Sequence, residues 1–307
     1  MKRLVLVCVA FICPLLLEAC QEKLEWEIEL EIVAGNTEPA ENGEEKIEYE
    51  EIMALGGKYN QGGDSWGDYF FQFTRTNSEV RVYDLSLKTL VQTIKITSSI
   101  GGFVSNCHCN TVCFGSEYYD VDDYFPLLYV STGYASGGYT GALVYRITQN
   151  NGIFFITLVQ TIKFPVGKSS WTEFVPAGEY AYLCYTSERV IFKVPMPKLK
   201  DGDMIISRDS AIDTFQFTPQ PNWMSTSRNQ GRMFYQGKIL FVSGVPHAGE
   251  ASVLVVLNLE TRERERMIDF KKNGLTSEPE SIFIWQGDIC VAFVDKIVRL
   301  IDFIDTL

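Results

Sequence analysis

Five residues with side chains that can bind a ligand stand at the same place in a repeated pattern. Each lies seven residues before a glycine, and the five are Asn60, His108, Trp171, Gln230 and Glu280. Amide, imidazole and carboxyl groups orient a ligand through hydrogen bonds, and an indole ring packs against its apolar parts. Such residues form one site only if the repeats bring them together.

Further polar and aromatic residues lie close to these positions or in the loops expected on the same side. Asn110, Glu173 and Arg232 lie two residues beyond a repeat position, and Glu278 lies two residues before one. Trp223 and Tyr139 lie in the loops. The predicted ligand site comprises His108, Asn110, Tyr134, Trp171, Glu173, Trp223, Arg228, Gln230, Arg232, His247 and Glu280.

The repeat itself predicts the fold. Its glycines, at positions 67, 115, 178, 237 and 287, are 48, 63, 59 and 50 residues apart. Four of them precede a charged residue and a short apolar strand, which is typical of a β-hairpin. Periods of this length without helical periodicity indicate a β-propeller of four-stranded blades.

The strands can be assigned in order from this pattern. The outer strands of the first two blades read TLVQTIKI and TLVQTIKF, 68 residues apart, which indicates duplication. The innermost strands are expected at 60–66, 108–114, 171–177, 230–236 and 280–286. The last blade lacks a fourth strand, so we expect an all-β, five-bladed propeller closed by an N-terminal strand, either within 26–32 or at 46–53.

Length and charge narrow the class of protein. The chain has 307 residues and a formal charge of −12, which suits one repeat domain and a monomer. No basic stripe that could neutralise phosphates occurs, so nucleic acid is not an expected partner.

The first residues predict export. Lys2 and Arg3 precede an apolar run that is too short to span a bilayer comfortably, as in a secretory signal. The end of this run, LEAC at 17–20, resembles a bacterial lipobox, although Glu18 departs from its usual small or apolar residue. The resemblance implies a signal peptide over 1–19, lipidation of Cys20, and attachment to the outer membrane on its periplasmic or cell-surface side. An acidic tether is expected over 20–45 and the propeller over 46–307.

Three stretches of the chain support the predicted fold and compartment, because they are similar to known proteins. GDYFFQF at 67–73, HCNTVCFG at 108–115 and FPLLYVS at 125–131 resemble β-propeller lipoproteins of Bacteroidales that have no assigned function. The resemblance covers most of residues 55–305. It implies the fold and the compartment but no chemistry.

No metal or cofactor is predicted. Cys107, Cys109 and Cys113 have the same parity on the expected strand, so they share one face, whereas His108 and Asn110 point the other way. This spacing matches no zinc site, and the acidic residues at 120–123 are expected on the opposite face of the ring, where a solvated loop is favoured over calcium binding. No P-loop, nucleophile elbow or dinucleotide motif occurs.

Three functions remain open. The favoured one is a non-catalytic propeller that binds a glycan, a peptide or a partner protein on its top face. The second is a glycoside hydrolase, in which Asp64, Glu173 and Glu280 supply the two carboxyl groups that such enzymes need. The third is a structural subunit of an envelope complex that binds through its blade edges.

Overall fold

The computed structural model describes residues 45–57, 60–75, 79–96, 108–136, 139–165, 172–185, 190–216 and 228–307, without the side chains of residues 133–136. The described part lies in one compact unit that begins at Asn42. It consists of β-strands and a few 3-10 helices of three residues each. None of these helices is long and apolar enough to cross a membrane.

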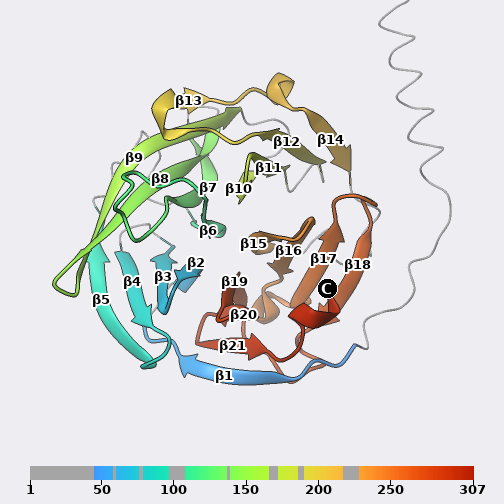
Figure 1. The fold of residues 1–307 in the computed structure, drawn as a ribbon. Coiled ribbons are helices and arrows are strands. Elements are labelled where there is room, and N and C mark those ends of the chain that lie inside the picture. The colour runs from blue at the N-terminus through green and yellow to red at the C-terminus, as the bar shows by residue number, and fades with distance from the viewer. Residues whose placement is uncertain are drawn as a thin grey trace, which may run out of the picture. The chain divides into compact units, whose positions relative to one another are not determined.

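Five small sheets form a ring around a central axis (Figure 1). The first blade contains β2 (Asn60–Trp66), β3 (Tyr69–Thr74), β4 (Glu79–Asp84) and β5 (Thr89–Lys95). The second contains β6 (Val112–Phe114), β7 (Leu128–Ser136), β8 (Tyr139–Asn150) and β9 (Ile153–Pro165), with the short β13 (Met204–Ile205) on its outer edge. The third contains β10 (Thr172–Ala177), β11 (Tyr180–Tyr185), β12 (Val190–Pro195) and β14 (Asp213–Gln216).

The fourth and fifth blades complete the ring. The fourth contains β15 (Asn229–Tyr235), β16 (Lys238–Ser243), β17 (Val253–Asn258) and β18 (Arg264–Asp269). The fifth contains β19 (Pro279–Trp285), β20 (Asp288–Phe293), β21 (Lys296–Leu300) and β1 (Tyr49–Ala54). The predicted five-bladed β-propeller is therefore confirmed.

The closing strand is the second of the two predicted candidates. β1 pairs with β21 in antiparallel register, from Tyr49 opposite Leu300 to Ala54 opposite Lys296. In Figure 1 it runs along the outside of the ring beside β21. The predicted strand within 26–32 lies outside the described residues.

Tight turns join the first two strands of four blades. Gly67 and Gly178 have φ of 58° and 69° and occupy the first turn position, where a type II′ turn requires a positive φ. In the fourth and fifth blades both turn residues have positive φ, as in a type I′ turn: Gln236 and Gly237, and Gln286 and Gly287. The charged residues after these glycines, Lys238 and Asp288, are the first residues of β16 and β20, as expected.

Hydrophobic cores fill the spaces between neighbouring blades. Phe71 packs into the core between the first and second blades, and its neighbour Phe70 packs with Phe283 between the first and fifth. Leu240 and Phe241 divide in the same way between the two sides of the fourth blade. Because strand side chains alternate in direction, a blade with both faces buried needs the continuous apolar runs seen in the sequence.

One expectation about strands is wrong, and one strand was not predicted. The innermost strand of the second blade was expected to start at His108, but β6 starts at Val112 because His108 has a φ of 48° and breaks the extended chain. The parity argument therefore fails, and Cys109 lies in an interblade core while Cys113 faces the channel. The strand that was not predicted is β13, which pairs in parallel with β9. Through this pairing the connection from β12 to β14 packs against the outer edge of the second blade.

Candidate functional site

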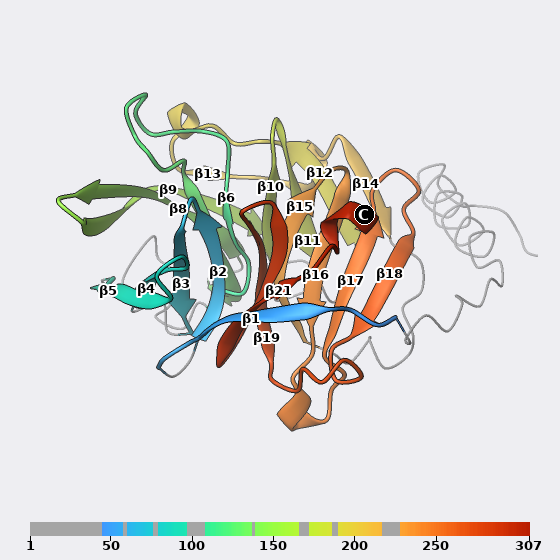
Figure 2. The same ribbon diagram turned by 60° about the horizontal axis from the view of Figure 1, so that its bottom comes forward.

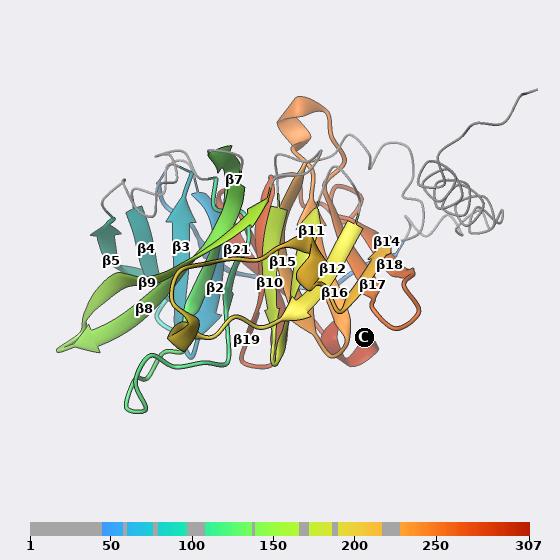
Figure 3. The same cartoon turned by 90° about the horizontal axis from the view of Figure 1, so that it is seen from above.

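The inner strands of all blades begin at one end of the central channel, which we call the upper mouth. We call the other end, where the hairpin turns lie, the lower end. The loop that carries the helix η4 (Pro246–Ala248) projects beyond the ends of the strands at the upper mouth (Figures 2 and 3).

Five polar side chains from three blades form a connected row at the upper mouth, here called the polar row. The Asn110 amide donates to the Gln230 side-chain oxygen at 2.9 Å and to the Asn229 carbonyl at 2.8 Å. The Gln230 amide donates to Glu278 at 2.7 Å. The row therefore joins the second blade to the fourth and the fourth to the fifth.

A histidine lies at each end of the polar row. His108 Nδ1 lies 3.0 Å from the Asn110 side-chain oxygen, and His247 Nδ1 lies 3.4 Å from Glu278 Oε2. Burial lowers the pKa of His108 more than its hydrogen bond to Asn110 raises it, which favours the neutral imidazole. The prediction that both histidines lie on this face agrees with their positions.

The acidic groups at the upper mouth hold their protons more tightly than usual. Burial raises the pKa of Glu278, against the opposing effects of His247 and Arg228. Glu280 is 1% exposed, and burial together with the neighbouring Glu278 raises its pKa well above the ordinary value. Among the described residues, Glu280 Oε2 has no hydrogen-bond partner.

A cavity of about 570 Å³, the rim cavity, lies at the outer side of the upper mouth. His247 lines it with a side chain that is 76% exposed, and Glu250 lines it beside Arg228. Glu250 accepts a hydrogen bond from the Arg228 backbone at 2.9 Å, and its other oxygen lies 3.5 Å from the Arg228 guanidinium. The cavity is also lined by Pro246, Gly249, Ala251, Ser252, Asp269, Lys271 and Thr276.

Below the polar row, a buried ion pair occupies the channel. The Arg232 guanidinium in β15 is bound to the Glu173 carboxylate in β10, and their side chains are 2% and 0% exposed. Arg232 also lies over the Phe241 ring at 4.7 Å, and its carbonyl accepts from the Cys113 thiol at 3.1 Å. Both residues were predicted to bind a ligand, but in the structure each is the ion-pair partner of the other inside the channel.

The remaining predicted residues fall into two groups. Trp171 and Trp223 lie outside the described residues, as does the side chain of Tyr134. Asp64 lines a separate cavity at the lower end of the channel, and neither Glu173 nor Glu280 lines it. The three candidate acids of the hydrolase hypothesis are therefore not gathered around one cavity.

Of the residues at the rim cavity, only His247 and the adjacent Arg228 were predicted from the sequence. Glu250, Asp269 and Lys271 were missed because they lie in irregular loops or at a strand end outside the repeat. The sequence does contain a pattern that marks the lower cavity, but this pattern was not recognised. Aromatic residues stand one to four positions before the turn glycines, and these are Trp66, Phe114, Phe234, Phe283 and Trp285.

Within the described residues, no group of three or more His, Cys, Asp or Glu side chains is placed to hold a metal ion. In the acidic loop of the second blade, Arg146 binds Asp123 through two hydrogen bonds of 2.7 and 2.9 Å. Cys109, Cys113, Cys184 and Cys290 are buried free thiols.

The ring of five sheets, four of them four-stranded and one five-stranded, and its polar channel mouth define the chain as a β-propeller with a central channel. No protein-family model and no curated protein matches it. Among solved structures, it is similar to glutaminyl cyclase from Myxococcus xanthus, with 12% identity, a TM-score of 0.50 and coverage of 83% of this chain and 97% of that one. It is also similar to the tail fiber of Staphylococcus aureus phage P68, with 11% identity, a TM-score of 0.50 and coverage of 90% of this chain and 55% of that one. Likenesses at these identities show the fold.

Proposed function

We propose that the protein is a non-catalytic binding protein that holds a glycan or a peptide at its upper mouth. The polar row carries this proposal, because it gathers amide, imidazole and carboxyl groups from three blades at one opening. Ligand sites are concave and contain a few convergent polar groups, as the row and the rim cavity do together.

The second candidate, a glycoside hydrolase, receives less support. Such enzymes need two carboxyl groups on either side of one sugar-binding cleft. Glu173 is bound to Arg232 inside the channel, and Asp64 lies at the lower end. Of the three acids named for hydrolysis, Glu280 alone lies at the upper mouth, beside Glu278, so the predicted catalytic set is not assembled there.

The compartment forms part of the proposal. A lipid on Cys20, supported by the lipobox-like LEAC at 17–20, would hold the propeller on the outer membrane. A surface or periplasmic location would bring the upper mouth into contact with envelope glycans or with imported glycans and peptides.

The test begins with the purified propeller on glycan and peptide arrays. For any ligand found, Trp171→Ala, Trp223→Ala and His247→Ala should each weaken binding by more than about 1 kcal/mol, the threshold for a contributing contact. Lys88→Ala, in the exposed turn before β5, serves as the control and should leave affinity unchanged. Equal loss of affinity and of melting temperature would instead show that the substituted residues are structural.

A further inference from the structure

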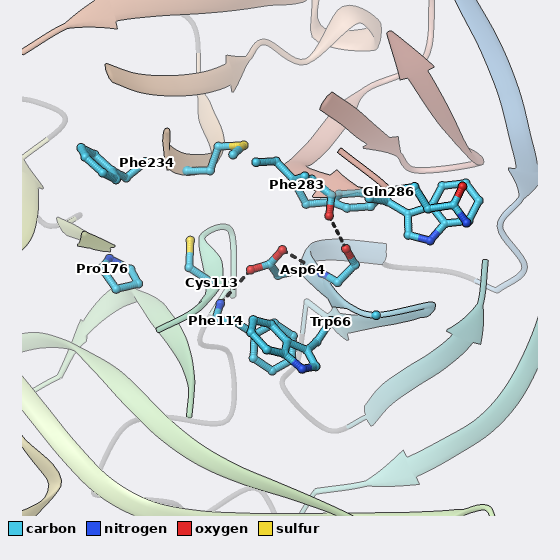
Figure 4. Close-up of a pocket in the computed structure, with 13 residues that line it drawn as sticks. Asp64, Trp66, Cys113, Phe114, Pro176, Phe234, Phe283 and Gln286 are labelled. Atoms are coloured by element: carbon cyan, nitrogen blue, oxygen red, sulfur yellow. Dashed lines mark hydrogen bonds between the residues drawn. The ribbon is translucent and has the colours of Figure 1, made fainter. Parts of the chain in front are cut away.

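The lower end of the channel contains a cavity that plays no part in the proposed function. This lower cavity has a volume of about 370 Å³, within the range of small-molecule sites. Asp64, in β2, lies near its centre in Figure 4, and its carboxylate reaches Phe114 in the inner strand of the second blade. Gly67 and Gln286, which are exposed turn residues, also line it, so the cavity opens at the turn side of the ring.

Asp64 supplies the charge of this cavity. Its two oxygens accept hydrogen bonds from the backbone of Ser65 and of Phe114, each at 2.7 Å (Figure 4). A carboxylate oxygen has two lone pairs, so each retains capacity for a further donor. Protein surrounds the carboxyl group, yet part of the residue's surface remains accessible from the cavity.

Within the described part of the chain, no cationic side chain lines the lower cavity to neutralise Asp64. Among the described residues that line the lower cavity there is no Lys, Arg or His, and the only other titratable group is the Cys113 thiol. Burial raises the pKa of that thiol well above its ordinary value, so it is uncharged. Glu173, whose charge also acts on Cys113, is already paired with Arg232.

The walls of the lower cavity are aromatic. Trp66 and Phe114 line it with their ring centres 5.8 Å apart, and Phe283 and Phe234 line it from the fifth and fourth blades. The negative faces of such rings attract a cation, and the rings exclude water from its apolar part. Tyr118, from the loop between β6 and β7, adds an edge-on contact to Trp66 at 6.5 Å near the opening.

We propose that the lower cavity binds a small organic ammonium ion, with Asp64 as its counter-ion and the aromatic walls around its apolar part. An anion would be repelled by the Asp64 carboxylate, and a neutral apolar molecule would leave that carboxylate without a counter-ion in the cavity. A protonated amine pairs its charge with the Asp64 carboxylate and packs its apolar part against the aromatic walls. This site is independent of the upper mouth, because the Arg232–Glu173 pair lies between them.

The acidity of Asp64 predicts how binding depends on pH. Burial raises the pKa of Asp64 to about 7, against the two backbone hydrogen bonds that lower it. A cation binds the ionised form of Asp64, so its affinity rises as pH increases through 7. The ligand itself stays protonated in this range, because an alkylamine has a pKa near that of lysine, about 10.4. Between pH 6 and pH 8 the ionised fraction of such a group, and hence the affinity, rises about tenfold.

The experiment uses isothermal titration calorimetry on the purified chain with phenethylammonium, cyclohexylammonium and tetramethylammonium chlorides, and with 2-phenylethanol as the uncharged counterpart. At least one ammonium ion should bind about tenfold more tightly at pH 8 than at pH 6, and more tightly than the alcohol. Asp64→Asn should weaken this binding at least tenfold at pH 8 and remove its pH dependence. Asp122→Asn, on the exposed loop of the same face, should change neither.

A second variant keeps the proposal testable if Asp64→Asn fails to fold. Trp66→Leu removes one ring of the wall and should weaken the ammonium ion several-fold more than the alcohol. Failure of all three ammonium ions to bind the wild-type protein, or equal affinity for the ion and the alcohol at pH 8, would overturn the proposal. Unchanged affinity in a folded Asp64→Asn protein would do so as well.

Discussion

The guanidinium of Arg232 and the carboxylate of Glu173 form an ion pair at the centre of the ring, with almost no exposure to solvent. Although burial works against its charge, the nearby Glu173 holds the pKa of Arg232 above its usual value. The pair joins the inner strands of the third and fourth blades. It also separates the polar row above from the lower cavity below.

The first prediction concerns this pair. Arg232→Met leaves a buried carboxylate without its partner and should lower the free energy of unfolding by about 3–5 kcal/mol, measured by urea denaturation. The double variant Arg232→Met with Glu173→Gln should recover much of this loss, because no charge then remains buried. If the double variant is no more stable than Arg232→Met alone, the charge of Glu173 is not the cause of the loss.

The second prediction concerns Glu280. Its pKa is raised in the folded state, so the neutral form is favoured, and stability is lost as pH rises from the ordinary value of 4.5 towards the raised one. Glu280→Gln should therefore stabilise the protein at pH 8 by about 1 kcal/mol or more, since one unit of pKa difference corresponds to about 1.4 kcal/mol. The gain should disappear at pH 4. A gain that is equal at both pH values would rule out this explanation.

The third prediction concerns ring closure. Deletion of residues 21–54 removes β1 and leaves the edge of β21 unpaired, so it should lower the melting temperature or cause aggregation. Deletion of residues 21–44 keeps β1 and is the matched control, which should melt as the full chain does. Thermal melts followed by circular dichroism compare the two. Identical melting of both truncated proteins would contradict a stabilising role for β1.

The fourth prediction concerns the anchor. If Cys20 carries a lipid, Cys20→Ser should release the protein from the membrane fraction of expressing bacteria, measured by fractionation in detergent-free buffer. Cys109→Ser is the control, since that thiol is buried in an interblade core and cannot reach a lipid in the folded protein. Membrane association that survives Cys20→Ser would show that the anchor is elsewhere or absent.

The repeat made the fold predictable, whereas local departures from it were not. The turn glycines and the apolar runs beside them mark each hairpin, so the blade number and most strands followed from local chemistry. His108 was placed in a strand because it stands seven residues before Gly115. The hydrogen bond from the Gly62 amide to the Cys109 carbonyl, at 2.8 Å, belongs instead to the packing of two blades. Sequence periodicity contains no information on such contacts between distant segments.

The candidate site was predictable to a similar degree. The shared repeat position brought His108, Gln230 and Glu280 to one end of the channel, as expected. It could not show that Arg232 and Glu173 are bound to each other, because both are polar residues at positions that also suit a ligand. Only the packed structure distinguishes a side chain that faces solvent from one that neutralises a neighbour.

The pairing of β1 with β21 also affects the order in which the protein can assemble during synthesis. Leu300 is 251 residues beyond its partner Tyr49 in the sequence, as the numbering of the pair shows. A ribosome must therefore release almost the whole propeller before the first strand finds its place, and until then both this strand and the growing sheet present unpaired backbone groups. The most distant pairing of the ring therefore needs nearly the whole chain, and unpaired strand edges stay exposed until it forms.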